Sequence, residues 1–122
     1  MHRYLHDESY WARGRARAVM DRAIDNSLVI GVYATASGEQ AGFARVVTDR
    51  ATHAWLCDVF VLPGHRGRGL ARWMVRTAVD HPGLTGVRRI LLATLDAHGL
   101  YAGQGFTPLT APENWMERPA PR

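Results

Sequence analysis

The sequence predicts a single α+β domain built on a mixed, mostly antiparallel sheet that is flanked by helices. Three β-rich segments follow one another through short polar turns, a glycine-punctuated loop leads from the third into an amphipathic helix, and an apolar run follows that helix. Because a helix connects the third segment to the apolar run, these two strands should be parallel neighbours in a right-handed crossover. The length of 122 residues suits one core.

The first half of the chain predicts one helix followed by an antiparallel meander. The helix is expected over residues 9–25, where Val19, Ala23 and Ile24 mark an apolar face and Asn26 is a stop signal. Polar turns at residues 36–39 and 49–50 separate the β-rich segments. Strands are therefore predicted over residues 28–34, 40–48 and 52–61.

The second half predicts a crossover helix and a buried strand. Leu70, Met74 and Ala78 share one side of a helix over residues 69–80, which the sequence His81-Pro82-Gly83 closes. The next strand, over residues 87–95, is apolar on both faces from Ile90 to Ala93, as a strand buried on both sides is. The remaining predicted elements are a short helix over residues 97–102 and strands near residues 106–109 and 115–118.

The net charge of +4 rests on arginine alone, because the chain contains no lysine. Arg68, Arg72 and Arg76 recur at every fourth residue and form a basic stripe that could follow nucleic-acid phosphates. Such a stripe is more often a solvated helix face, and no stacking aromatic platform or DNA-reading module accompanies it. The sequence therefore does not favour a nucleic-acid partner.

Cysteine and histidine usage indicates neither a disulfide framework nor a metal site. Cys57 is the single cysteine, and apart from His2 and His6 no two histidines have His-x-x-x-His spacing, so we expect no bound metal. No apolar run is long enough to cross a membrane, and the first residues lack the apolar segment of a signal peptide. We expect a cytoplasmic protein with no membrane partner.

The loop between the third strand and the crossover helix predicts a phosphate site. Gly67 and Gly69 allow the backbone to approach a ligand closely, and the helix that follows directs its first N–H groups outward. Arg66 and Arg68 add charge-assisted donors, which suit a nucleotide pyrophosphate. The alternative is an ordinary glycine turn with solvated arginines.

The sequence Arg66-Gly67-Arg68-Gly69-Leu70-Ala71 resembles the Arg/Gln-x-x-Gly-x-Gly/Ala signature of the GNAT family of acyl-CoA N-acyltransferases. The resemblance continues through a strand at residues 87–95, Leu100-Tyr101 and Gly105-Phe106, which match that family's next strand, tyrosine-bearing helix and Gly-Phe turn. It covers residues 28–118, and it implies an acetyl-CoA-dependent N-acetyltransferase. Acetyl would pass from acetyl-CoA, the co-substrate, to a primary amine by direct attack in a ternary complex.

The resemblance also implies the site residues. It assigns the CoA pyrophosphate to the loop from Arg66 through Gly67, Arg68, Gly69 and Leu70 to Ala71, and the pantetheine and thioester carbonyl to backbone groups of Phe60, Val61 and Leu62. Tyr101 matches the tyrosine that acts as general acid toward the thiolate, a step that suits a phenol in a low-dielectric setting. The alternative for Tyr101 is a packed core residue.

The general base is open at this stage. Asp58 interrupts an apolar strand, which is costly unless the charge is paired or used, so it is the candidate base or substrate contact. Asp49, Asp96 and Glu39 are further candidates, although a salt bridge or a turn cap explains each as well. His98 could titrate near neutrality, but Asp96 capping the next helix with His98 exposed is the simpler interpretation. A water relay would also serve.

One departure from the family pattern concerns the N-terminus. GNAT proteins generally begin with a strand and two helices, whereas only one convincing helix precedes residue 28, so the first strand is expected to be missing. We divide the domain into an N-terminal helical segment (1–27), a GNAT core (28–118) and a tail (119–122).

The alternative function is a non-catalytic CoA-binding sensor or partner subunit. The exposed sheet edge at Val29 predicts a homodimer. The acceptor amine is left open.

Overall fold

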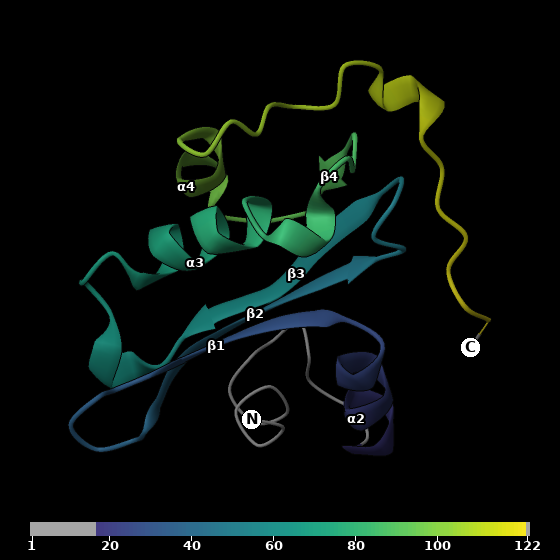
Figure 1. Ribbon diagram of the computed structural model, residues 1–122. Helices are drawn as coiled ribbons and strands as arrows, with labels where there is room; N and C mark the ends of the chain where they lie inside the picture. Colours follow the sequence, from purple (N-terminus) through teal and green to yellow (C-terminus); the bar gives the residue numbers. More distant parts are fainter. Residues whose placement is uncertain (1–16, 122) are drawn as a thin grey trace.

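The computed structural model describes residues 17–121, in which four strands form one sheet in the order β1-β2-β3-β4 (Figure 1). Strands β1 (Leu28–Tyr33), β2 (Gln40–Thr48) and β3 (Ala54–Val61) form an antiparallel meander. Strand β4 (Ile90–Leu91) runs parallel to β3, with Ala54 opposite Ile90 and Trp55 opposite Leu91. The α+β class and the parallel crossover are thereby confirmed.

Helices cover both faces of this sheet. Helix α3 (Leu70–Val79) lies along one face and α2 (Arg17–Asp25) lies on the other, while the short α4 (His98–Ala102) sits beside α3 (Figure 1). Short 3₁₀ turns, η2 (Pro63–His65), η3 (Pro82–Leu84) and η4 (Pro112–Asn114), lie in the connections.

Two apolar clusters correspond to the two faces. The larger cluster joins the buried residues of α3 and η3 to those of β2 and β3: Val46, Ala54, Leu56, Val75, Ala78 and Leu84. The smaller one joins Met20 of α2 to Phe43 and Phe60, whose rings are tilted at a centroid distance of 5.6 Å. Because opposite faces of β2 and β3 are buried, α2 and α3 fix the sheet between them.

The predicted strand over residues 87–95 is wrong in its extent, because only Ile90 and Leu91 pair with β3. Beyond Leu91 a cavity separates residues 93–97 from residues 55–59 of β3. Two strands that diverge in this way cannot continue their hydrogen-bond ladder, so the second half of the expected strand is irregular.

The predicted strands near residues 106–109 and 115–118 are also wrong, since both segments are irregular. Residues 104–110 line a cavity of about 460 Å³ together with Ile90 and Leu91 of β4, and no strand pairing joins the two segments. Pro108 and Pro112 carry no N–H donor, and Pro112 begins η4 instead. The start of the N-terminal helix at residue 9 and the missing first strand both lie outside the described residues.

Candidate active site

Strand β3 carries a β-bulge at Asp58. Phe43 of β2 lies opposite Phe60 and Arg45 lies opposite Cys57, so Asp58 and Val59 together oppose one residue of β2. Asp58 has a φ of 52°, in the left-handed region that non-glycine residues seldom adopt. An extra residue reverses the alternation of faces, which is why Leu56 packs toward α3 whereas Phe60 packs toward α2.

A cavity of about 400 Å³ opens where the bulged strand and the chain after β4 diverge. One wall consists of residues 55–59 of β3, and the opposite wall consists of residues 93–97 together with Tyr101 of α4. The polar residues Asp58, Thr94, Asp96 and Tyr101 are part of its lining, and the side chain of Asp58 is itself buried. The sequence-predicted residues Asp58 and Tyr101 are therefore brought to one cavity from two separate elements.

Asp58 forms a buried ion pair inside the sheet. Arg45 donates from Nε to Asp58 Oδ2 at 2.8 Å, and the two side chains are 11% and 1% exposed. The guanidinium also donates from Nη1 to Ser27 Oγ at 3.1 Å, and that hydroxyl donates to the carbonyl of Ala23 in α2 at 2.6 Å. The Asp58 carboxylate is thus held in place by a cation from the neighbouring strand. Sequence reasoning missed Arg45.

Tyr101 is half-buried, and its ring meets that of Phe106 edge to face at 5.8 Å between centroids. Burial raises the pKa of the Tyr101 hydroxyl, and the negative charge of Asp96 raises it further. Because both effects disfavour the tyrosinate, the phenol keeps its proton at neutral pH.

The glycine loop has the open geometry that a phosphate cradle requires. Gly67 and Gly69 have φ values of 82° and 75°, and a Cβ added to either would meet no atom within 4 Å. Gly69 is the N-cap of α3, and it leaves the first turn of α3 without a side-chain cap. Side chains other than glycine would be strained here and would fill the space in front of those N–H groups.

The arginines of the loop have different surroundings. Arg66 donates from Nε to the carbonyl of Val61 at 3.0 Å, which ties the loop to the end of β3. Arg68 is exposed, as are Arg72 and Arg76 along α3. The structure thus places a band of positive charge beside the uncapped end of α3.

The strand end assigned to pantetheine is already partly hydrogen-bonded. Leu62 donates its N–H to the carbonyl of Ala41 at 2.8 Å and accepts from the N–H of His65 at 2.9 Å. Phe60 is buried, whereas Val61 and Leu62 are half-buried. The β3 backbone therefore enters the loop in a fixed path.

The remaining acidic candidates are engaged in turns or are exposed. Asp49 accepts from the hydroxyl and N–H of Thr52 and from the N–H of Ala51, and these bonds hold its pKa far below the usual range. Asp96 is exposed, and the expected helix cap is wrong, because Ala97 is the N-cap of α4 and donates its N–H to Thr94 Oγ1 at 3.1 Å. His98 is exposed at the start of α4.

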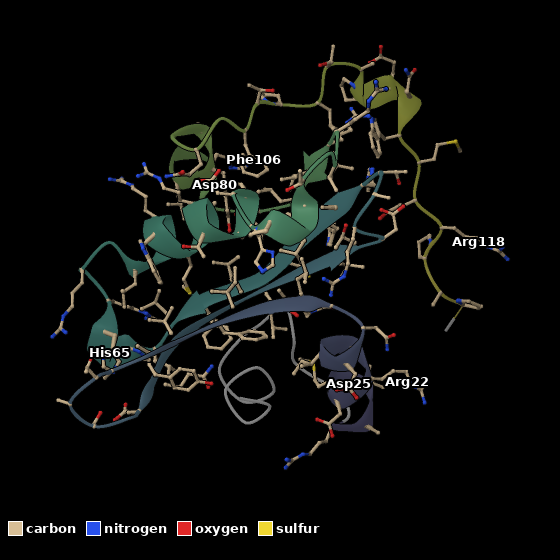
Figure 2. The ribbon with its side chains drawn as sticks, in the orientation of Figure 1. Arg22, Asp25, His65, Asp80, Phe106 and Arg118 are labelled. Atoms are coloured by element: carbon tan, nitrogen blue, oxygen red, sulfur yellow. The ribbon has the colours of Figure 1, made fainter. Side chains whose placement is uncertain are left out.

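Glu39 lies closer to the loop than its place in a hairpin suggests. Its Oε1 is 3.6 Å from His65 Nε2, so the β1–β2 hairpin reaches the β3–α3 connection. Figure 2 shows His65 at the far left of the view, where the two connections meet. Glu39 is exposed, and it is not among the residues that line the cavity beside Tyr101.

Residues 17–121 contain neither a candidate membrane-spanning helix nor a group of metal-ligating side chains. No helix in this part of the chain is both long and apolar enough to span a membrane. Likewise, no three His, Cys, Asp or Glu side chains among the described residues gather as metal ligands.

This mixed sheet, with a bulged third strand and an open glycine loop before α3, has the architecture of the GNAT fold. The model of the Acetyltransferase (GNAT) family matches residues 25–106, and the chain belongs to that family. The family and the fold class expected from the glycine motif are therefore confirmed.

Individual relatives agree with this assignment. A crystal structure from Xanthomonas campestris pv. campestris, of a protein assigned as a GNAT acetyltransferase, is 50% identical and superimposes with a TM-score of 0.91 over 98% of this chain and 83% of that one. A structure from Deinococcus radiodurans, also assigned as an acetyltransferase, shares the fold at 18% identity, with a TM-score of 0.72 over 97% and 80% of the two chains.

A curated relative from Gibberella zeae, assigned as an acetyltransferase, is 30% identical over 112 residues. The match covers 78% of this chain but only 63% of that relative. The chain therefore spans less than two thirds of the length of the curated relative that it matches.

Proposed function

We propose that the protein transfers an acetyl group from acetyl-CoA to a primary amine by direct attack in a ternary complex. The observation that carries this proposal is the arrangement along β3: its end leads into the open glycine loop, and its bulge lines the cavity that Tyr101 completes. A single extended donor could contact both places, with its phosphates at the loop and its thioester at the cavity.

The loop supports the phosphate half of this proposal. The uncapped first turn of α3 offers N–H donors and the positive end of a helix dipole, and Arg68 adds a mobile charge beside it. The space in front of Gly67 and Gly69 is open to a ligand, because a Cβ built at either residue meets no atom within 4 Å outside the adjoining residues. We assign pyrophosphate binding to Arg66, Gly67, Arg68, Gly69, Leu70 and Ala71.

The cavity supports the acyl-transfer half. In the proposed reaction, the amine nitrogen forms a bond to the acetyl carbonyl carbon and the C–S bond breaks. Tyr101 donates its proton to the departing thiolate, the nitrogen loses a proton to solvent, and solvent returns a proton to the Tyr101 phenolate. The raised pKa of Tyr101 keeps that proton available. The β3 backbone at Phe60, Val61 and Leu62 would align the pantetheine arm.

We assign proton removal from the amine to a water relay. Asp49 is committed to a turn, and the Asp58 carboxylate is the buried ion-pair partner of Arg45. Thr94 and Asp96 at the opposite wall provide polar groups that a chain of waters could follow.

Two measurements made together test this function. Calorimetry should detect binding of CoA and acetyl-CoA, and a thiol-release assay with a panel of small amines and peptide N-termini should detect acetyl transfer. Binding with transfer to one or more amines is the expected result. Binding without transfer to any amine would support a non-catalytic CoA sensor, and no binding would overturn the proposal.

A further inference from the structure

We propose that Arg45 is a positioning residue for acetyl transfer, because its ion pair with Asp58 fixes the β3 bulge that forms one wall of the cavity. This inference rests on the proposed function, and it assigns Asp58 a structural task in that function. Neither side chain needs to touch substrate. What they set is the path of the β3 backbone past the thioester.

Asp58 has a backbone conformation that side-chain-bearing residues seldom adopt. Its φ of 52° is disfavoured for any side chain other than glycine and persists only where the surroundings impose it. Aspartate and asparagine tolerate this region better than most residues, and Asp58 is held there by the 2.8 Å bond to Arg45 Nε. The ion pair and the strained residue are therefore one unit.

The ion pair and the strained Asp58 lie at the wall of the cavity. Asp58 is in the middle of the β3 segment that lines the cavity opposite Thr94, Asp96 and Tyr101. If the ion pair no longer fixed the bulge, the backbone at Asp58 would shift, and the cavity wall would move with it. A misplacement of about 1 Å at a reacting group can lower the rate by about a hundredfold.

Stability alone is a weak reason for a buried ion pair between Arg45 and Asp58. Apolar residues of similar volume often replace a buried ion pair without loss of stability, whereas removal of one partner leaves an unpaired charge. Here the pair coincides with a bulge at the cavity wall. An ion pair that positions the bulge accounts for its place at the cavity wall, whereas an ion pair that only stabilises the fold does not.

Arg45 also connects the bulge to α2. Through its Nη1 bond to Ser27 Oγ, and through the bond from that hydroxyl to the carbonyl of Ala23, the cation joins the end of α2 to the cavity wall. Ser27→Ala should therefore reduce turnover by less than loss of Arg45, since it removes the connection to α2 but keeps the ion pair.

The decisive experiment compares Arg45→Met, the double variant Arg45→Met/Asp58→Leu, and Arg45→Lys. The double variant leaves no unpaired charge, so it should be more stable than Arg45→Met, and it should lose stability against the wild type only by the strain of leucine at a φ of 52°. Its kcat should nevertheless fall, on the order of tenfold to a hundredfold, as expected for a misplaced reacting group. Arg45→Lys, which keeps the charge opposite Asp58, should recover part of the lost turnover. Arg22→Met, an exposed arginine of α2, is the matched control.

A second readout does not depend on turnover. Adenosine 3′,5′-bisphosphate carries the nucleoside and two of the three phosphates of CoA without the pantetheine arm, so it reports on the nucleotide contacts and not on the cavity. Arg45→Met/Asp58→Leu should bind this fragment as the wild type does but should bind acetyl-CoA several-fold more weakly. A double variant that is stable, with wild-type kcat and acetyl-CoA affinity, would overturn the inference and leave the proposed function intact. A wild type that binds acetyl-CoA but transfers to no amine would contradict the proposed function, and the fragment comparison would still test the bulge.

Discussion

The N–H of Phe106 donates to the carbonyl of Tyr101 at 3.1 Å, and the two rings meet edge to face. The turn between them depends on Gly105, because glycine adopts its φ of 94° readily and other residues do not. Figure 2 shows Phe106 on the side of the sheet that α3 covers, where it packs with Tyr101 against the larger apolar cluster. The Gly-Phe turn therefore holds the tyrosine ring at the cavity.

Removal of the Tyr101 hydroxyl should separate catalysis from packing. Tyr101→Phe keeps the ring and its contact with Phe106 but removes the proton donor, so we expect kcat to fall by about a hundredfold or more with little change in acetyl-CoA affinity. Steady-state kinetics and calorimetry measure the two effects. Tyr33→Phe, at an exposed position of β1, is the control and should leave both unchanged. Unchanged turnover in Tyr101→Phe, with chemistry rate-limiting, would make Tyr101 a packing residue.

The pH dependence of kcat should report the environment of Tyr101. Burial, and then the charge of Asp96, raise the pKa of this phenol above its usual value of 10.0, so the activity that needs its proton should be lost only above that pH. Asp96→Asn removes the negative charge that disfavours the tyrosinate. The alkaline limb of the profile should therefore move to lower pH in Asp96→Asn. A shift to higher pH would contradict this account.

The open space at Gly69 predicts how CoA binding can be abolished. Gly69→Asp places a side chain and a negative charge in front of the uncapped N–H groups of α3, so binding of CoA should be lost. Thermal shift with and without CoA measures the effect.

Gly86→Asp is the matched control for this substitution. Gly86 also has a positive φ, of 86°, and a Cβ there likewise meets no atom within 4 Å, so both variants carry the same backbone strain. Gly86→Asp should lose stability but retain the CoA-dependent shift. If Gly69→Asp keeps that shift, pyrophosphate does not bind at the loop.

A side chain added at Gly42 of β2 should lower the stability of the fold without changing its charge. A Cβ at this position would lie 3.0 Å from Sδ and Cε of Met74 and 3.2 Å from the carbonyl oxygen of Phe60. The Met74 side chain could move, but the backbone of β3 could not without a shift of the sheet. Gly42→Ala should therefore lower the free energy of unfolding by about 1–3 kcal/mol. Gly64→Ala, where the Cβ meets nothing, should leave the Tm nearly unchanged.

The sequence was sufficient for the meander, the crossover helix and the glycine loop, because each depends on local signals. Residues 69–80 were predicted as helical and α3 spans Leu70–Val79, since the apolar spacing and the flanking glycine and proline fix both ends. Strand β4 and the C-terminal segment were not predictable in this way. Their pairing depends on whether a neighbouring strand lies within hydrogen-bond distance, and a cavity lies there instead.

Arg45 was missed for a related reason. The sequence showed an aspartate that interrupts an apolar strand, and it showed an arginine in the preceding strand, but the register that brings them together depends on the bulge. Two opposite charges in adjacent apolar strands of a hairpin are a signal that could have found this pair. Whether such a charge is paired or catalytic is decided by the register alone.

The edge of the sheet at β1 leads to a prediction about assembly. In the described sheet β1 is an outer strand, and its Val29 is 44% exposed, while α2 packs on a face of the sheet through Met20. Edge strands with apolar side chains are normally covered, so we expect a homodimer that buries on the order of 1,600 Å². Light scattering at tens of micromolar measures its mass.

Two variants distinguish the ways in which this dimer could form. Val29→Lys places a charge on β1 and should dissociate a dimer that pairs the sheet edges. Val19→Lys, at a position of α2 that is 56% exposed, should instead dissociate a dimer that packs the N-terminal helix against the partner. Each variant is the control for the other. A fully active wild-type monomer would contradict both modes, and the acceptor site would then be built from one chain.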